Sequence, residues 1–280
     1  MPQHKANTSY VIFLSLVAAL GGILFGYDTG VIAGTTATVS AQFALSEMSK
    51  GWYVGCALAG TILGVAVAGV MSDFLGRKVT MLIAAVFFSV SAIGCCICIG
   101  FQDRVLYRII GGVGIGIVSI VSPIYISEVS PAKIRGTMVS LYQLAITLGL
   151  LLSYLVNYII LKNSSTSTAE GWLEWVLVSE YWTGMLGSET FVALFFFLII
   201  FFIPESPRWL MVKRREDRAA RIYRRLMATA EGAAAELEAT KANISGEVKS
   251  RWSEMRHPGI IKAVCIGAAI AILGQFMGVN

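Results

Sequence analysis

The chain has 280 residues, of which 56% are hydrophobic and only 14% are charged, and its formal net charge is +5. Soluble domains carry roughly 25% charged residues, so a chain this apolar cannot cover its surface in water, and lipid is the expected solvent. The basic excess does not indicate nucleic-acid binding, because most of the basic residues lie on one side of the predicted membrane segments.

Seven continuous apolar runs follow one another along the chain, and each approaches the roughly 20 residues that a helix needs to cross a bilayer. They cover residues 9–31, 51–72, 79–102, 109–127, 137–161, 184–203 and 263–280. The sequence therefore predicts an all-α membrane protein. We expect a six-span bundle over 1–203, a connector over 204–258, and the first span of a second bundle over 259–280.

Lysine and arginine give the predicted orientation, because cytoplasmic loops are enriched in these two residues. Eighteen of the 22 lie before the first span or in every second loop, which places the N-terminus in the cytoplasm. We expect a multi-pass protein of the plasma membrane. The other four, in outer loops or at span ends, are Lys50, Arg104, Arg108 and Lys162.

The connector differs from the spans, because it is polar and basic. Within it, DRAARIYRRLM places an apolar set at the spacing of one helix face, namely Ala220, Tyr223, Leu226 and Met227. Such a segment is either a solvated linker or a set of short cytoplasmic helices that lie against the membrane domain, and the apolar face favours the helices. Six spans, a long connector and a further span match one half of a two-part transporter followed by the start of the other.

The first span contains a single acid, Asp28, in the glycine-rich stretch GGILFGYDTGVIAG. A charged side chain inside a membrane costs about 3 kcal/mol or more unless it is paired or hydrated, so Asp28 indicates either a function or a structural ion pair. The surrounding glycines give one helix face with little bulk, which suits close packing or leaves room for a ligand. The sixth span also contains an acid, Glu189, which we assign to a charge network that gates the protein.

Three loops on the predicted cytoplasmic side each offer an acid and a base. Glycine at position 76 suits a tight turn, and Arg77 could pair with an acid across the bundle, while Asp73 could cap a neighbouring helix. Pairs that form in one conformation and break in another act as a gate, which we favour over plain positive-inside loops. The residues are Asp73 and Arg77 in GVMSDFLGRK, Glu128 and Arg135 in PIYISEVSPAKIRG, and Glu205 and Arg208 in PESPRWL.

No motif for a chemical reaction, a metal or a cofactor appears in the sequence. RIIGGVGIGIVS has the glycine spacing of a nucleotide loop, but it lies inside a span, where Gly112 and Gly116 are better explained as a close-packing face. The five cysteines lie in apolar runs and lack the spacing of metal ligands. We therefore expect neither an enzyme nor a cofactor.

The sequence resembles the sugar porter family of the major facilitator superfamily, and its proton-coupled xylose porters in particular. The resemblance extends in order over nearly the whole chain, through GGILFGYDTGVIAG, GVMSDFLGRK, RIIGGVGIGIVSIVSPIYISEVSPAKIRG, PESPRWL and GQFMGVN. It implies a twelve-span protein of two halves that moves a monosaccharide by alternating access. The chain would then be the N-terminal half plus one helix, and would need the missing C-terminal half for transport.

The resemblance also implies roles for individual residues. Asp28 matches the acid that carries the proton in proton-coupled members, and Arg135 matches an arginine near that acid. Phe25 matches an aromatic residue of the sugar pocket, while Gln275 and Asn280 match sugar contacts of the seventh span. The expected function is symport of a pentose or hexose with protons across a bacterial inner membrane. The alternatives are a facilitative uniporter, or a sugar receptor or half-transporter that does not transport.

The chain departs from the family pattern at three positions. Leu150 replaces a frequent glutamine of the fifth span, and Gly274 replaces one of two glutamines in the seventh. The residue after Trp182 is Thr183, where the family has an arginine. The resemblance therefore implies that the cytoplasmic charge network lacks one arginine. These differences leave the identity of the sugar open.

Overall fold

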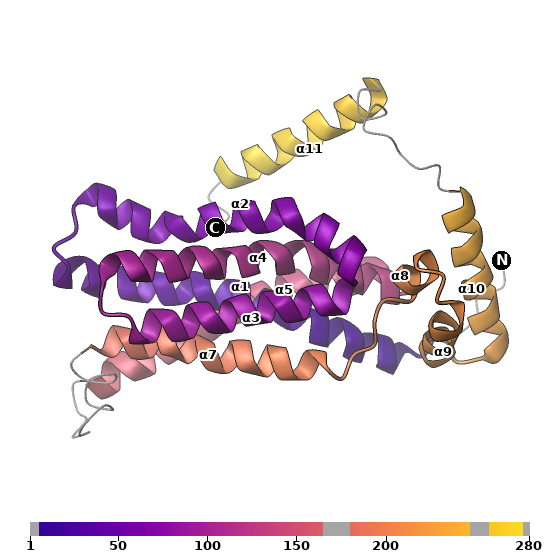
Figure 1. Ribbon diagram of the computed structural model, residues 1–280, viewed down its shortest axis with the longest axis horizontal. Helices are drawn as coiled ribbons and strands as arrows, with labels where there is room; N and C mark the ends of the chain where they lie inside the picture. Colours follow the sequence, from indigo (N-terminus) through magenta and orange to yellow (C-terminus); the bar gives the residue numbers. More distant parts are fainter. Residues whose placement is uncertain (1–5, 165–179, 247–257, 277–280) are drawn as a thin grey trace. The chain divides into compact units, whose positions relative to one another are not determined.

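Six long apolar helices form the bundle in the computed structural model, which describes residues 6–164, 180–246 and 258–276 (Figure 1). All six are long and apolar enough to cross a membrane. They agree with the first six predicted spans. The helices are α1 (Thr8–Gln42), α2 (Glu47–Leu75), α3 (Arg77–Ile97), α4 (Phe101–Val129), α5 (Arg135–Ser164) and α7 (Tyr181–Ile200).

The helix boundaries differ most from the predicted spans at two places. The first helix continues to Gln42, beyond the predicted end at residue 31, because hydropathy marks the part of a helix that suits lipid and not its full length. The third predicted span, 79–102, is divided between two helices. The backbone is extended at Cys98, and α4 begins after Gly100.

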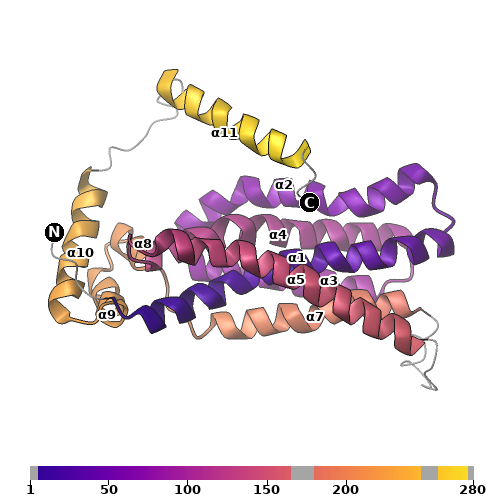
Figure 2. The ribbon, with the colours of Figure 1, turned by 180° about the vertical axis from the view of Figure 1, so that it is seen from behind.

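Glycines determine how the six helices pack. The first helix packs on α4, α5 and α7, while α2 packs on α4, and α3 packs on α4 and α7 (Figure 2). A Cβ atom at Gly26 of α1 would overlap the backbone carbonyl of Ile146 in α5, and one at Gly112 of α4 would overlap that of Ala57 in α2. The glycine-rich face around residue 26 is thus used for close packing against α5, and the predicted packing role of Gly112 is confirmed.

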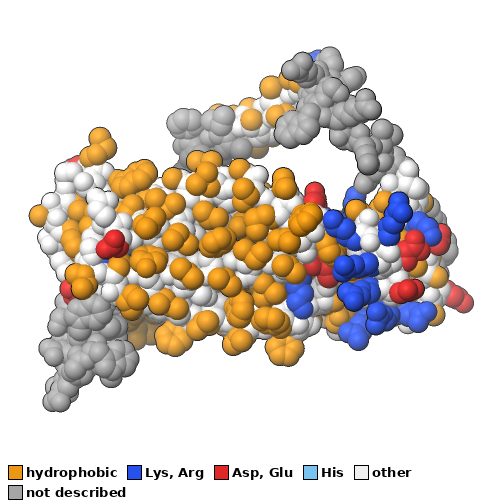
Figure 3. Space-filling model, in the orientation of Figure 1, with side chains coloured by type: hydrophobic (Ala, Val, Ile, Leu, Met, Phe, Trp, Pro, Cys, Tyr) orange, Lys and Arg blue, Asp and Glu red, His pale blue; other side chains and the backbone are white. Residues whose placement is uncertain are grey.

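The outer surface of the bundle is apolar over most of its length (Figure 3). Leucine and isoleucine side chains on α2 and α5 are largely exposed there, although such residues are usually buried in soluble proteins. A continuous exposed apolar surface of this kind indicates contact with lipid. Examples are Leu58, Ile62 and Leu63 on α2, and Leu151 and Leu155 on α5.

Two short helices of the connector, α8 (Pro207–Val212) and α9 (Glu216–Leu226), pack on each other and against the bundle. The backbone N–H of Asn7, just before α1, donates to the carbonyl of Leu226 at 2.8 Å. The apolar face of α9 is buried, but it comprises Ala219, Ile222, Tyr223 and Leu226, so two of the four predicted positions were wrong. We call this end of the bundle, where α1 and α3 begin, the connector end.

The chain divides into two compact units between Leu237 and Glu238, within α10 (Ala230–Gly246). The first unit therefore contains the predicted bundle together with α8 and α9. The second unit contains α11 (Pro258–Phe276), which begins five residues before the predicted seventh span. The end of that span, from 277 to 280, lies outside the described residues.

Candidate functional site

An ion pair joins α1 to α4 inside the bundle. Nη1 of Arg108 donates to Oδ1 of Asp28 at 3.3 Å, and the Arg108 and Asp28 side chains are 3% and 14% exposed. The Arg108 guanidinium also lies 5.5 Å from the ring centre of Tyr53, in cation–π contact. The acid predicted from the sequence is therefore paired, but its partner comes from a different helix than expected.

The expected pairing of Asp28 with Arg135 was wrong. Arg135 is the first residue of α5, and its Nε donates to the carbonyl of Ser130 at the connector end. Next to Asp28, Gly26 packs on Ile146, eleven residues further along α5. At 1.5 Å per residue, Arg135 therefore lies about 16 Å along the helix axis from that level, which is further than a side chain extends.

A second buried acid, Glu189 of α7, belongs to the same charge cluster. It is 4% exposed and lies close enough to Asp28 and Arg108 to interact electrostatically with both. The hydroxyls of Tyr27 and Ser188, which directly precede the two acids, are hydrogen-bonded at 2.7 Å and hold α1 against α7. We expected Glu189 in the gating charge network, and in the structure it lies within reach of Asp28 and Arg108.

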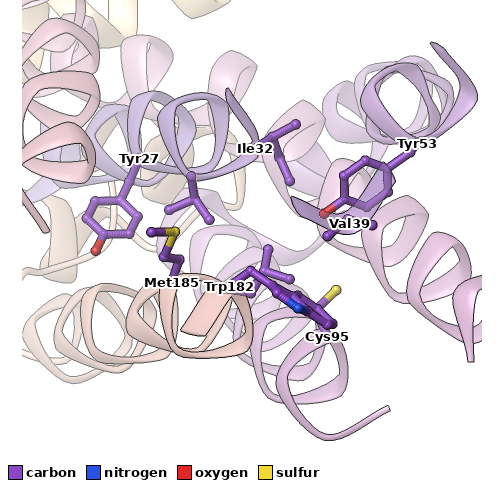
Figure 4. Close-up of a cluster of buried hydrophobic side chains, with 9 residues drawn as sticks. Tyr27, Ile32, Val39, Tyr53, Cys95, Trp182 and Met185 are labelled. Atoms are coloured by element: carbon purple, nitrogen blue, oxygen red, sulfur yellow. The ribbon is translucent and has the colours of Figure 1, made fainter. Parts of the chain in front are cut away.

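Apolar side chains from α1, α2, α3 and α7 pack around this cluster (Figure 4). Tyr27 and Met185 lie on the facing sides of α1 and α7 in Figure 4, and both are at most 2% exposed. An apolar environment strengthens the attraction within an ion pair, and it also makes any unpaired charge costly. The remaining members of this apolar cluster are Val31, Ile32, Val39, Tyr53, Cys95, Trp182 and Leu186.

Charged residues from two loops and a helix end meet at the connector end. Arg77 binds Glu128 with both Nε and Nη2 at 3.1 Å, which is the strong bidentate geometry of an arginine–carboxylate pair. Its Nη1 also donates to Asp73 at 3.1 Å. Arg77 thus pairs with an acid across the bundle, as its position suggested. Arg208 lies on α8, and its side chain is exposed.

The acid that caps a helix at this end is Glu205, and not Asp73. Its Oε1 accepts hydrogen bonds from the backbone N–H groups of Arg77 and Lys78, at 2.9 and 3.1 Å, at the start of α3. Burial raises the pKa of Glu205, and the N–H groups of Ser206, Lys78 and Arg77 partly oppose that rise. Gly76, with φ of +99°, makes the turn between α2 and α3 that brings these groups together.

The predicted sugar contacts are only partly within the described residues. Phe25 is half-buried on α1, one turn before Asp28. Gln275 lies in α11, but its side chain is outside the description, as is Asn280 altogether. The indole N–H of Trp182 bonds Gln42 at 2.7 Å, which places neighbouring Thr183 at the end opposite the connector. Thr183 therefore lies far from the charge network of the connector end, in which its effect was expected.

Arg108 is the functional candidate that sequence reasoning missed. It was assigned to the outer end of a span because the apolar run begins one residue later. One signal could have identified it, since a basic residue at the outer end of a span opposes the positive-inside trend and calls for a buried partner.

Comparison with known proteins shows similarity to membrane transporters. The sequence model of the "Sugar (and other) transporter" family matches residues 14–280. The chain is 38% identical to the glucose transport protein of Synechocystis over 282 residues, which cover 99% of this chain and 59% of that protein. It is 37% identical to the D-xylose-proton symporter of Escherichia coli K12 over 300 residues, covering 98% and 59%.

A solved structure of the xylose transporter XylE from Escherichia coli, in a partially occluded inward open conformation, has the same fold. The TM-score is 0.81 at 36% sequence identity, over 97% of this chain and 65% of that chain. The chain therefore spans somewhat more than half the length of the relatives it matches.

Proposed function

Since the chain belongs to the sugar porter family of the major facilitator superfamily, whose members are transporters and not enzymes, we propose that it works as part of a proton-coupled sugar symporter. A C-terminal half like that of its relatives would complete the transporter. A pentose or hexose is the proposed substrate, because the similar proteins include a D-xylose-proton symporter and a glucose transport protein.

The charge cluster inside the bundle is the observation that supports proton coupling most strongly. Asp28 and Glu189 are two acids beside one cation, Arg108, so ionisation of both would leave a negative charge uncompensated in an apolar environment. Such a charge is costly, and proton binding removes it. The cluster is therefore suited to hold one proton.

Alternating access would make this proton exchangeable. A carboxylate that loses its cationic partner in a low-dielectric site tends to bind a proton, and one that regains the partner tends to release it. Asp28 and Arg108 lie on different helices, so a shift between α1 and α4 would separate them. In this mechanism Arg108 takes the role first assigned to Arg135, and Asp28 carries the proton.

The remaining proposed roles follow from position. Phe25 would line the sugar pathway near Asp28, with Gln275 and Asn280 as further sugar contacts. Arg77, Glu128, Asp73 and Glu205 would hold the connector end closed by bonds that break when it opens. Arg208 would border this network on α8. The connector end would face the cytoplasm of a bacterial cell, with the protein in its inner membrane.

Uphill sugar uptake tests the proposal. In proteoliposomes that contain the complete transporter and an inward proton gradient, we expect D-xylose or D-glucose to accumulate above its external concentration. Asp28→Asn should abolish accumulation and leave sugar exchange in place, whereas Asp103→Asn, a change of an exposed acid near the start of α4, should keep both. Accumulation by the Asp28→Asn variant equal to that of the unmodified protein would contradict the proposal, and exchange without accumulation in the unmodified protein would indicate a uniporter.

A further inference from the structure

A basic groove lies between α8 and α9 at the connector end. Its cavity has a volume of about 280 Å³, close to the lower end of the range for small-ligand sites. Three of its lining residues are arginines, and two are apolar. The lining residues are Glu205, Leu210, Arg218, Arg221, Ile222 and Arg225.

The arginines of the groove form one stripe on α9. Arg218, Arg221 and Arg225 follow the i, i+3, i+7 spacing that places side chains on one helix face. The neighbouring buried face fixes the direction of this stripe, because Ala219 and Leu226 pack beneath it. The groove therefore presents three exposed guanidinium groups at a defined position.

These charges are available to an external anion. Within the described part of the chain, no carboxylate lies within 4.0 Å of the guanidinium nitrogens of Arg218, Arg221 or Arg225. The one acid of the groove, Glu205, already accepts hydrogen bonds from the backbone N–H groups of Arg77, Lys78 and Ser206. The groove thus has a positive charge excess that the carboxylates of the described residues do not pair with.

The groove borders the surface that contacts lipid. Lysine and arginine side chains gather at the end of the apolar surface where α8 and α9 lie (Figure 3). Large apolar side chains at the same end are exposed, including Phe74, Phe202 and Val212. The ammonium of Lys213 lies 5.5 Å from the ring centre of Phe74, so basic and apolar side chains adjoin each other directly.

We propose that this groove binds the headgroup phosphate of an anionic phospholipid from the adjacent leaflet. Arginine forks match the oxygens of a phosphate group, and clustered basic residues at a membrane surface attract anionic lipids. Leu210 and Ile222 line the base of the groove, and the exposed Phe74 and Val212 at the same end offer apolar contacts to the lipid, which a free phosphate ion would not use. The proposal needs the bundle to lie in a membrane, and it is independent of proton coupling.

Lipid binding to the purified chain tests this proposal. The chain in detergent is titrated with dioleoyl phosphatidylglycerol or dioleoyl phosphatidylcholine, and the bound lipid is counted by native mass spectrometry. Two double variants with the same loss of charge are compared: Arg221→Gln/Arg225→Gln in the groove, and Arg214→Gln/Arg224→Gln outside its lining. Circular dichroism confirms that each variant keeps its helices, and Arg218→Gln gives a milder change within the groove.

Each arginine near an anionic surface contributes a factor of roughly 5 in binding. We therefore expect phosphatidylglycerol to bind about 25-fold more weakly to the groove double variant than to the control, and about 5-fold more weakly to Arg218→Gln. Equal losses in the two double variants, or equal binding of both lipids, would overturn the proposal. Displacement of the lipid by millimolar glycerol phosphate would also overturn it, because the groove would then be a site for soluble phosphate compounds.

Discussion

Arg108 and Asp28 are 80 residues apart in the chain and form a hydrogen-bonded ion pair of 3.3 Å between α4 and α1. The pair lies inside the bundle, and because its side chains are only 3% and 14% exposed, each charge is largely shielded from water. With Glu189 nearby, the three interacting charged groups are two acids and one base, and the next buried cation, Arg104, lies one helical turn away over the ring of Trp182. This imbalance is the physical basis for proposing that a proton binds there.

Removing the cation should destabilise the bundle. Arg108→Gln leaves two buried acids without their positive partner, and loss of one member of a buried pair costs about 3–5 kcal/mol. We expect a lower apparent melting temperature of the chain in detergent. The double variant Asp28→Asn/Arg108→Gln removes both charges of the pair and should recover much of the loss. A double variant less stable than Arg108→Gln alone would show that the pair is not the source of the effect.

The two acids bound by Arg77 should differ in energetic coupling to it. The Glu128 side chain is 8% exposed, and that of Asp73 is 76% exposed. Double-mutant cycles with Arg77→Gln should therefore give a coupling energy of roughly 1–3 kcal/mol for Glu128→Gln, but below about 1 kcal/mol for Asp73→Asn. Thermal unfolding in detergent supplies the values, and a larger coupling to Asp73 would contradict the role assigned to Glu128.

Close packing of α1 on α5 should make position 26 intolerant of any side chain. Gly26→Ala places a methyl group against the carbonyl of Ile146, and overpacking of this kind costs about 1–3 kcal/mol. Gly69→Ala in α2 is the matched control, because nothing lies within 4 Å of a Cβ at that position. We expect Gly26→Ala to lower the melting temperature and Gly69→Ala to leave it unchanged or raise it slightly. Equal effects would mean that the helices do not approach closely at position 26.

Glu205 should make stability fall as pH rises above its usual pKa of 4.5. Burial raises the pKa of this acid, so the folded protein holds the Glu205 proton more tightly than the unfolded chain. The resulting contribution is fully present below pH 4.5 and is lost as pH rises through the raised pKa. Melting curves between pH 4 and 8 should show the unmodified chain losing stability relative to Glu205→Gln as pH rises. A relative gain over that interval would reverse the sign and exclude the assigned shift.

The membrane helices could be predicted from the sequence because lipid imposes a simple condition, a continuous apolar run of sufficient length. An apolar run does not show how far a helix continues beyond the lipid, so the extension of α1 to Gln42 was not predicted. The division of the third run at Cys98 was also missed, because an apolar residue can occupy a helix or an extended turn equally well.

The partner of Asp28 could not be predicted from the sequence, because it depends on which helices become neighbours. Local spacing identified the acid, but the contact with Arg108 arises when α1 packs on α4. Glu205 illustrates the same limit. Its motif was recognised, yet its role as the cap of α3 requires the end of α7 and the start of α3 to meet. Contacts between helices thus decide which groups pair, and the sequence does not give those contacts.

Proton movement during sugar entry tests the central claim most directly. The complete transporter is reconstituted in proteoliposomes in a weakly buffered medium, and the external pH is recorded when D-xylose or D-glucose is added. We predict that the medium becomes more alkaline as sugar enters with protons, and that Asp28→Asn abolishes this change. Sugar entry without a pH change in the unmodified protein, or an unchanged alkaline shift in Asp28→Asn, would contradict the account.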